Sequence, residues 1–124
     1  MLVFYLLQSD MFSVPGPMTV MDGCYNSYYQ HNDDMLADIV NILQREVLAL
    51  VANGCKHVMI DEPALVYYPE KALQHGVEDI EKIFAACPDD VRKEIILTDT
   101  DLDVPVDDEI IRKLEQAGIY QAKC

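Results

Sequence analysis

Two kinds of hydrophobic pattern alternate along this chain. From residue 33 to residue 52, apolar residues recur at spacings of three and four, which predicts an amphipathic helix. Asn32 or Asp33 is expected to cap this helix, and Asn53-Gly54 to end it. A short apolar run, HVMI at 57–60, follows and predicts a buried strand. The predicted helical stripe consists of Leu36, Ile39, Val40, Leu43, Val47, Leu50 and Val51.

The same order of helix and strand recurs twice. Val77, Ile80, Ile83 and Phe84 fall on one face of a predicted helix before Pro88, and the run EIILTD predicts the next strand. Asp107 or Asp108 is expected to cap a last helix, with Ile110, Ile111 and Leu114 inward, Gly118 as its stop and a strand beginning at IY. This alternation is typical of parallel α/β units. About three units are present, whereas a closed (β/α)8 barrel has eight in roughly 250 residues, so an open sheet or part of a barrel is predicted.

The first residues are less regular. The run LVFYLL at 2–7 indicates a buried strand or a leader foreign to the domain. Residues 11–23 predict a short strand broken by Pro15, Gly16 and Pro17, because the prolines interrupt the ladder. A polar, aromatic loop is expected to follow, and it contains Tyr25, Tyr28 and Tyr29.

Composition narrows the class of protein. The 124 residues are 51% hydrophobic, which is typical of a globular domain, and the net charge is −13. Such a charge disfavours nucleic acid and anionic membrane as partners. The four cysteines form no C-x-x-C pair and are expected to be reduced and mostly buried. The apolar start lacks signal-peptide features, so a cytoplasmic protein is predicted.

The segment VMIDEPALVYYP, residues 58–69, carries the candidate chemistry. Asp61 and Glu62 emerge where a predicted parallel strand ends, which is the edge where α/β proteins place their sites. Side chains alternate along a strand, so one acid is expected to face the mouth of the sheet and the other to brace the loop. A carboxylate held there suits an ammonium group or general-base chemistry. A solvated pair of loop acids is the alternative.

These segments resemble a known family. VPGPMTV, NSYY, EVLALVANGCKHVMIDEPAL and HGVEDIEKIFAACPDDVRKEI are similar to the C-terminal domain of cobalamin-independent methionine synthases, of the archaeal single-domain type. The resemblance implies a TIM barrel that transfers a methyl group from a folate to homocysteine or a similar thiol, which the family activates with zinc. It also implies that Asp61 holds the substrate's amino group, with Glu62 beside it.

Two departures from the family pattern limit what this chain is expected to do. The strand that should end in His-x-Cys, a pair of zinc ligands, reads EIILTDTDLD, so zinc is not expected to bind. The chain is expected to be one partial barrel domain, 1–124, family-like over about 12–95 and divergent at 1–11 and 96–124. We therefore predict a truncated member whose own methyltransferase activity is left open.

The sequence also suggests roles for two further residues and two alternative functions. Tyr28 is predicted to line a substrate mouth, or alternatively to pack in a loop, and Ser13 to lie near a substrate carboxylate beside the proline turn. One alternative function is a non-catalytic chain that associates with itself or with a longer paralogue through exposed barrel edges. The other is a uroporphyrinogen decarboxylase-like barrel, which the scarcity of arginines in the DEPAL segment disfavours.

Overall fold

The computed structural model describes residues 11–97 and 105–122, which contain one four-stranded parallel sheet. The strands lie in chain order. Because they are parallel, each connection brings the chain back to the end of the sheet where the strands begin, and the next strand is added beside the previous one. This confirms the predicted parallel α/β class. The strands are β1 (Met11–Pro15), β2 (His57–Asp61), β3 (Arg92–Ile96) and β4 (Tyr120–Gln121).

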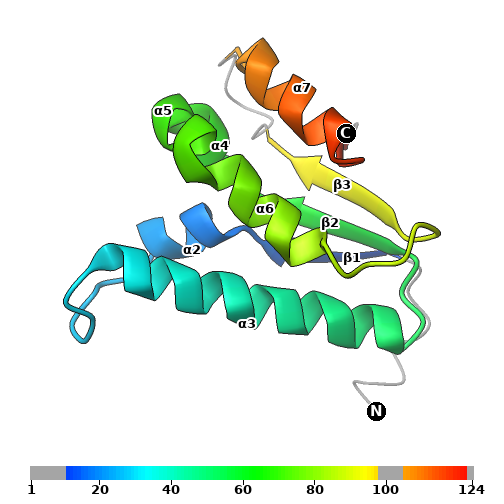
Figure 1. The fold of residues 1–124 in the computed structure, drawn as a ribbon, viewed down its shortest axis with the longest axis horizontal. Helices are drawn as coiled ribbons and strands as arrows, with labels where there is room; N and C mark the ends of the chain where they lie inside the picture. The colour runs from blue at the N-terminus through cyan, green and yellow to red at the C-terminus, as the bar shows by residue number, and fades with distance from the viewer. Residues whose placement is uncertain (1–10, 98–104, 123–124) are drawn as a thin grey trace.

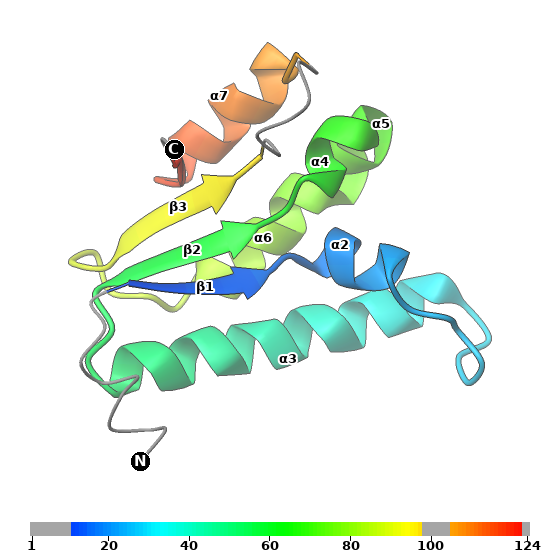
Figure 2. The ribbon, with the colours of Figure 1, turned by 180° about the vertical axis from the view of Figure 1, so that it is seen from behind.

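All three long helices cover the same face of this sheet. Figure 1 shows α3 (Asn32–Ala52), α6 (Val77–Phe84) and α7 (Asp108–Gln116) in front of the strands. Figure 2, from behind, shows the strands with no described helix across them. The arrowheads of β1 and β2 point toward the short helices α2 (Pro17–Asp22), α4 (Ala64–Tyr67) and α5 (Pro69–Lys71), the last of which continues into the π-helical turn η1 (Ala72–Gly76).

The hydrophobic core lies between the sheet and these helices. Val58, Ile60 and Ile95 have no exposed surface and present every second side chain of the central strands to the helices. Burying one such side chain contributes about 1.5–3 kcal/mol. The facing helical positions are those of the predicted stripes, and the fully buried ones are Val47, Ile80, Ile83 and Ile110.

The helix ends agree with the sequence in most places. Gly54 has φ 100° and Gly118 φ 76°, which confirms both as stops that use the left-handed region. Asp107 caps α7 by accepting a hydrogen bond of 2.8 Å from the amide of Glu109. The cap predicted for the first long helix is wrong. His31 takes the N-cap position of α3 without a side-chain bond, and Asn32 is the first helical residue, whose Oδ1 accepts from Asn26 Nδ2 at 2.8 Å.

Two helical regions were not predicted. Residues 17–22 were expected to belong to a short strand that the prolines interrupt, and no helix was predicted for 64–75, yet both regions form short helices. Pro17 and Pro69 each occupy a first-turn position, where a proline fixes φ and lacks the N–H that has no intrahelical acceptor. The short runs show no long apolar stripe, so periodicity alone gave no signal.

No helix within the described ranges has the length and apolar character to cross a membrane. The strand or leader predicted at residues 2–7 and the terminal Cys124 lie outside those ranges. Within them, the thiols of Cys55 and Cys87 are buried, and that of Cys24 is exposed.

Candidate functional site: the carboxyl end of β2

Asp61 and Glu62 lie on opposite sides of the sheet. Ile60 and Glu62 lie on the helical side with no exposed surface, whereas Asp61 is exposed on the face that no described helix covers. Within residues 11–97 and 105–122, no hydrogen bond or ion pair engages the Asp61 carboxylate. The carboxylate at the end of β2 is therefore accessible to a small cation.

The buried Glu62 carboxylate binds the start of α2. Its Oε2 accepts a hydrogen bond from the amide of Met18 at 2.8 Å. Its Oε1 accepts from the amide of Thr19 at 2.7 Å and from the Thr19 hydroxyl at 2.6 Å. Charge-assisted bonds of this kind are stronger than neutral ones. Both oxygens of a fully buried acid are thus satisfied by one helix turn.

The local sequence of β1–α2 explains this arrangement. The N-cap of α2 is Gly16, which has no side chain with which to cap the helix, and Pro17 has no N–H to satisfy. The free amides of the first turn are those of Met18 and Thr19, and Glu62 reaches them from more than 40 residues away. A distant carboxylate therefore supplies the cap that α2 lacks.

Backbone bonds hold the same junction. The Gly16 amide donates to the Asp61 carbonyl at 2.7 Å, and the Glu62 amide donates to the Ile96 carbonyl at 3.0 Å. The Glu62 carbonyl in turn accepts from Leu65 at 3.2 Å, at the start of α4. The peptide groups on both sides of Glu62, and the residue before it, are consequently tied to β1, β3 and α4.

Burial dominates the electrostatics of Glu62. Loss of hydration raises the pKa of its carboxyl, and the negative charge of Asp61 adds to this effect. The bonds from Thr19 and Met18 favour the ionised form and act in the opposite direction. The net direction is upward, so this acid holds its proton more strongly than a solvated glutamate does.

The uncovered face also carries Ser13 and a charged cluster. Ser13 is exposed and pairs in register with Met59, two residues before Asp61 on the same face of the sheet. Toward the strand starts, His57 Nε2 lies 2.8 Å from Glu94 Oε1, and Arg92 contacts the same oxygen. His57 begins β2 and Asp61 ends it, as the sequence predicted. This cluster is therefore at the opposite end of the strands from Asp61.

Tyr28 lies in the loop between α2 and α3, which both figures show at the outer end of α3. Its side chain is 88% exposed and packs edge-on against Tyr29, whose hydroxyl donates to Asp38 at 2.7 Å. The loop places Tyr28 among its own neighbours rather than on the uncovered face beside Asp61. Its predicted role at a substrate mouth stays a prediction.

The described residues do not fit a zinc centre. No three His, Cys, Asp or Glu side chains of the described ranges are grouped so that they would hold a metal ion. Structural and catalytic zinc sites need three or four such ligands. Cys55 and Cys87 are buried in the core, away from the exposed face that bears Asp61.

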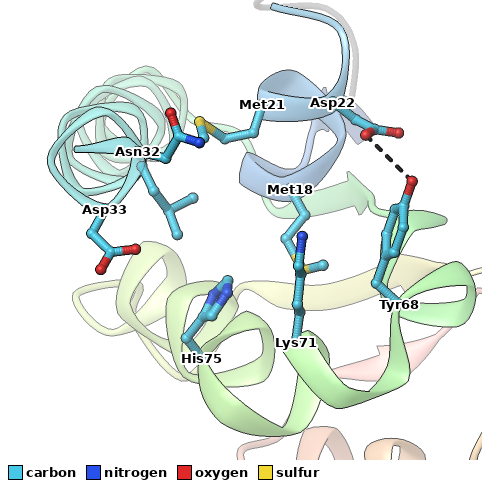
Figure 3. Close-up of a pocket in the computed structure, with 9 residues that line it drawn as sticks. Met18, Met21, Asp22, Asn32, Asp33, Tyr68, Lys71 and His75 are labelled. Carbon is cyan, nitrogen blue, oxygen red and sulfur yellow. Dashed lines mark hydrogen bonds between the residues drawn. The ribbon is translucent and has the colours of Figure 1, made fainter. Parts of the chain in front are cut away.

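A cavity of about 420 Å³ opens on the helical side of the same rim (Figure 3). Lys71 and His75 rise from one wall, Asp22 and Asp33 lie on the others, and the Tyr68 hydroxyl donates to Asp22 at 3.4 Å. The sequence did not predict it, because its lining comes from three segments that lie far apart in the chain. Its charged groups are of both signs, and we assign it no ligand.

A parallel sheet in chain order with helices on one face is the architecture of part of a TIM barrel, in which the carboxyl ends of the strands form the mouth. Comparisons with known proteins show what the chain is similar to. The methionine synthases of Saccharolobus islandicus (strain Y.G.57.14 / Yellowstone #1) and Saccharolobus solfataricus are each 34% identical over 68 residues, 55% of this chain and 20% of theirs. That of Pyrococcus furiosus is 31% identical over 58 residues, 47% of this chain and 17% of its own length. No protein-family model matches the chain.

A solved structure shows the same likeness in fold. A B12-independent methionine synthase from Shewanella sp. W3-18-1, solved in complex with selenomethionine, superposes with a TM-score of 0.71 at 20% identity, over 84% of this chain and 32% of that one. Over about half of its length the chain is therefore similar in sequence to methionine synthases, and it shares the partial-barrel fold of a B12-independent methionine synthase. It spans about a fifth of the length of the curated relatives named above.

Proposed function

We propose that this chain is the amino-acid-binding part of a methionine-synthase-type barrel. In this proposal the Asp61 carboxylate binds the ammonium group of a homocysteine- or methionine-like substrate. The observation that carries it is the accessible carboxylate at the carboxyl end of β2, on the uncovered face. The Shewanella relative holds selenomethionine, an amino acid of this class.

Ser13 is proposed to take part at the same face. It lies on β1, one strand away from Asp61, with its side chain on the uncovered face. A hydroxyl there can donate to the carboxylate of a bound amino acid while Asp61 accepts from its ammonium group. The two residues together would recognise both charged ends of the substrate's backbone.

Methyl transfer from a folate-type donor is proposed to need more polypeptide than the described residues. In this reaction class a metal ion lowers the pKa of the acceptor thiol. The described residues offer no ligand set for it, so no reaction step is assigned to them. Substrate binding through Asp61 and methyl transfer are therefore separate properties, and only the first is proposed for these residues.

Calorimetric titration tests the binding proposal. L-Methionine and 4-(methylthio)butanoate differ in the amino group alone, so their affinity ratio reports contact with the amine. We expect wild type to prefer L-methionine and Asp61→Asn to lose roughly tenfold or more of that preference, since a hydrogen bond to a charged group is worth about 1.5–3 kcal/mol. Asp34→Asn on exposed α3 removes the same charge and should behave as wild type. Equal affinities in wild type would contradict the proposal.

A second function is suggested by the uncovered face itself. Tyr120 is 57% exposed and Met11 43% exposed there, whereas the interior of a closed barrel is filled by side chains. About two thirds of the Shewanella enzyme's chain lies outside the superposition. We propose that the occupant of this face is the remaining barrel segment of a longer chain of the same family.

Sedimentation with a purified full-length family member tests this association. Wild type should form a one-to-one complex, and Tyr120→Asp should weaken it by placing a charge in the interface. Ile42→Asp is the matched control, because Ile42 is 53% exposed on α3, on the helical side. A wild-type chain that sediments as a monomer in the mixture, or one that forms only a homodimer, would contradict the proposed occupant.

A further inference from the structure

The residue next to the proposed substrate carboxylate has its own part in the site. We propose that Glu62 is a positioning residue: through the first turn of α2, its carboxylate fixes the β1–α2 junction against β2 and so holds Asp61 in its binding orientation. This inference deepens the proposed function and rests on it for the substrate's identity. Its structural half can be tested without any ligand.

The hydrogen bonds around Glu62 link the first turn of α2 and the β1–α2 junction back to the end of β2. The Glu62 side chain binds the amides of Met18 and Thr19, and the same junction returns to β2 through the bond from the Gly16 amide to the Asp61 carbonyl, 2.7 Å long. On its other side, the peptide that joins Asp61 to Glu62 donates to Ile96 of β3. The backbone of Asp61 is thereby held between two strands, and only its side-chain torsions remain free.

The Glu62 side chain packs so closely against Gly16 that no side chain fits there. A Cβ on Gly16 would lie 2.3 Å from Cδ and from Oε2 of Glu62 and 2.7 Å from its Cβ. Gly16 has φ −78° and ψ 162°, a conformation open to any residue, so close approach rather than backbone shape requires glycine here. Junction and carboxylate are therefore fitted to each other, and a displacement of Glu62 must also move the turn.

Glutamate is the side chain that this position demands. Its three partners are all donors, two amides and one hydroxyl, and a carboxylate offers acceptors alone. A glutamine of the same shape would turn an NH₂ group toward at least one N–H. Glu62→Gln therefore tests the bonding without changing the volume of the residue.

Amide hydrogen exchange measures the protection of the amides that take part in these hydrogen bonds. First-turn amides of a helix have no intrahelical acceptor, so slow exchange at Met18 and Thr19 depends on Glu62. Glu62→Gln should speed exchange at both amides by roughly tenfold or more, and also at Gly16, whose amide binds Asp61. Glu70→Gln, at an exposed position of α5, is the matched control.

A pair of milder substitutions at Thr19 keeps the proposal testable if the Glu62→Gln variant does not fold. Thr19→Val removes the hydroxyl that donates to Glu62 and keeps the shape, whereas Thr19→Ser keeps the hydroxyl. Exchange at Gly16 should rise in the valine variant and stay near wild type in the serine variant. Unchanged exchange at Gly16 in both Glu62→Gln and Thr19→Val would overturn the proposal, whether or not any ligand binds.

The functional half uses the ratio of affinities for L-methionine and 4-(methylthio)butanoate. If Glu62 positions Asp61, Glu62→Gln and Thr19→Val should lower this ratio roughly tenfold and leave the affinity for the deaminated analogue nearly unchanged. A merely structural role would weaken both ligands alike and would overturn the inference. If wild type shows no preference for the amine, the proposed function fails, and the exchange at Gly16 still decides the positioning role.

Discussion

Glu62 occupies the space that a side chain on Gly16 would need: a Cβ there would lie 2.3 Å from the carboxyl carbon. This contact joins PGPMT and DEPAL, which lie in two of the segments that carry the family resemblance. Position 16 is glycine because Glu62 fills the space of a Cβ, and position 62 is an acid because it accepts hydrogen bonds from the amides of Met18 and Thr19.

Replacing Gly16 should therefore be costly. Gly16→Ala forces the carboxylate or the turn to move, and overpacking of this kind costs about 1–3 kcal/mol of the free energy of unfolding. Gly23→Ala, at the end of α2, meets nothing closer than 3.7 Å and is the matched control. Urea denaturation measures both. Equal midpoints for the two variants would show that the turn adjusts without cost.

The raised pKa of Glu62 gives stability a distinct dependence on pH. The folded state holds this proton more strongly than the unfolded state, whose ordinary value is 4.5. The Glu62 contribution is thus greatest below that value, falls as pH rises through the folded pKa, and is constant above it. The unfolding free energy of wild type relative to Glu62→Gln should follow this curve.

Asp90 supplies a control of opposite sign. The ammonium group of Lys56, 2.8 Å away, lowers the pKa of the Asp90 carboxyl below 3.8. Its contribution is present above that value and is lost as pH falls through the folded pKa. Wild type relative to Asp90→Asn should therefore lose stability toward acid. A Glu62→Gln difference with this same slope would contradict the assigned direction.

The cap of α7 makes a separate prediction about stability. Asp107→Ala removes the acceptor for the Glu109 amide and should cost about 0.5–2 kcal/mol, whereas Asp107→Asn keeps an acceptor and should cost less. Asp108→Ala, one residue further along, leaves this bond in place. Thermal unfolding distinguishes the three variants, and equal losses for the two alanine variants would argue against the cap.

Much of the fold was readable from the sequence, because its long helices have clear apolar stripes and its glycine stops need positive φ. Val47 and Ile80 show this, since both were placed by spacing and both are fully buried. The short helices were missed, because one or two turns show no period and their starts are set by Pro17 and Pro69.

The site was only partly readable. Alternation along β2 predicted that Asp61 and Glu62 diverge, and they do. Nothing in local spacing shows that Glu62 would cap α2, since its partners lie more than 40 residues earlier. A glycine between two prolines was the available signal, and it indicated a turn without naming what approaches it. The predicted roles of Ser13 and Tyr28 in binding stay predictions.

The carboxyl carbon of Asp61, observed by ¹³C NMR during ligand titration, gives the most direct test of substrate binding at this carboxylate. L-Methionine should shift this resonance in a saturable way, and 4-(methylthio)butanoate at equal occupancy should leave it nearly unchanged. A saturable L-methionine site whose shifts fall elsewhere, with the Asp61 resonance unmoved, would contradict the assignment of Asp61 as the group that holds the substrate's amine.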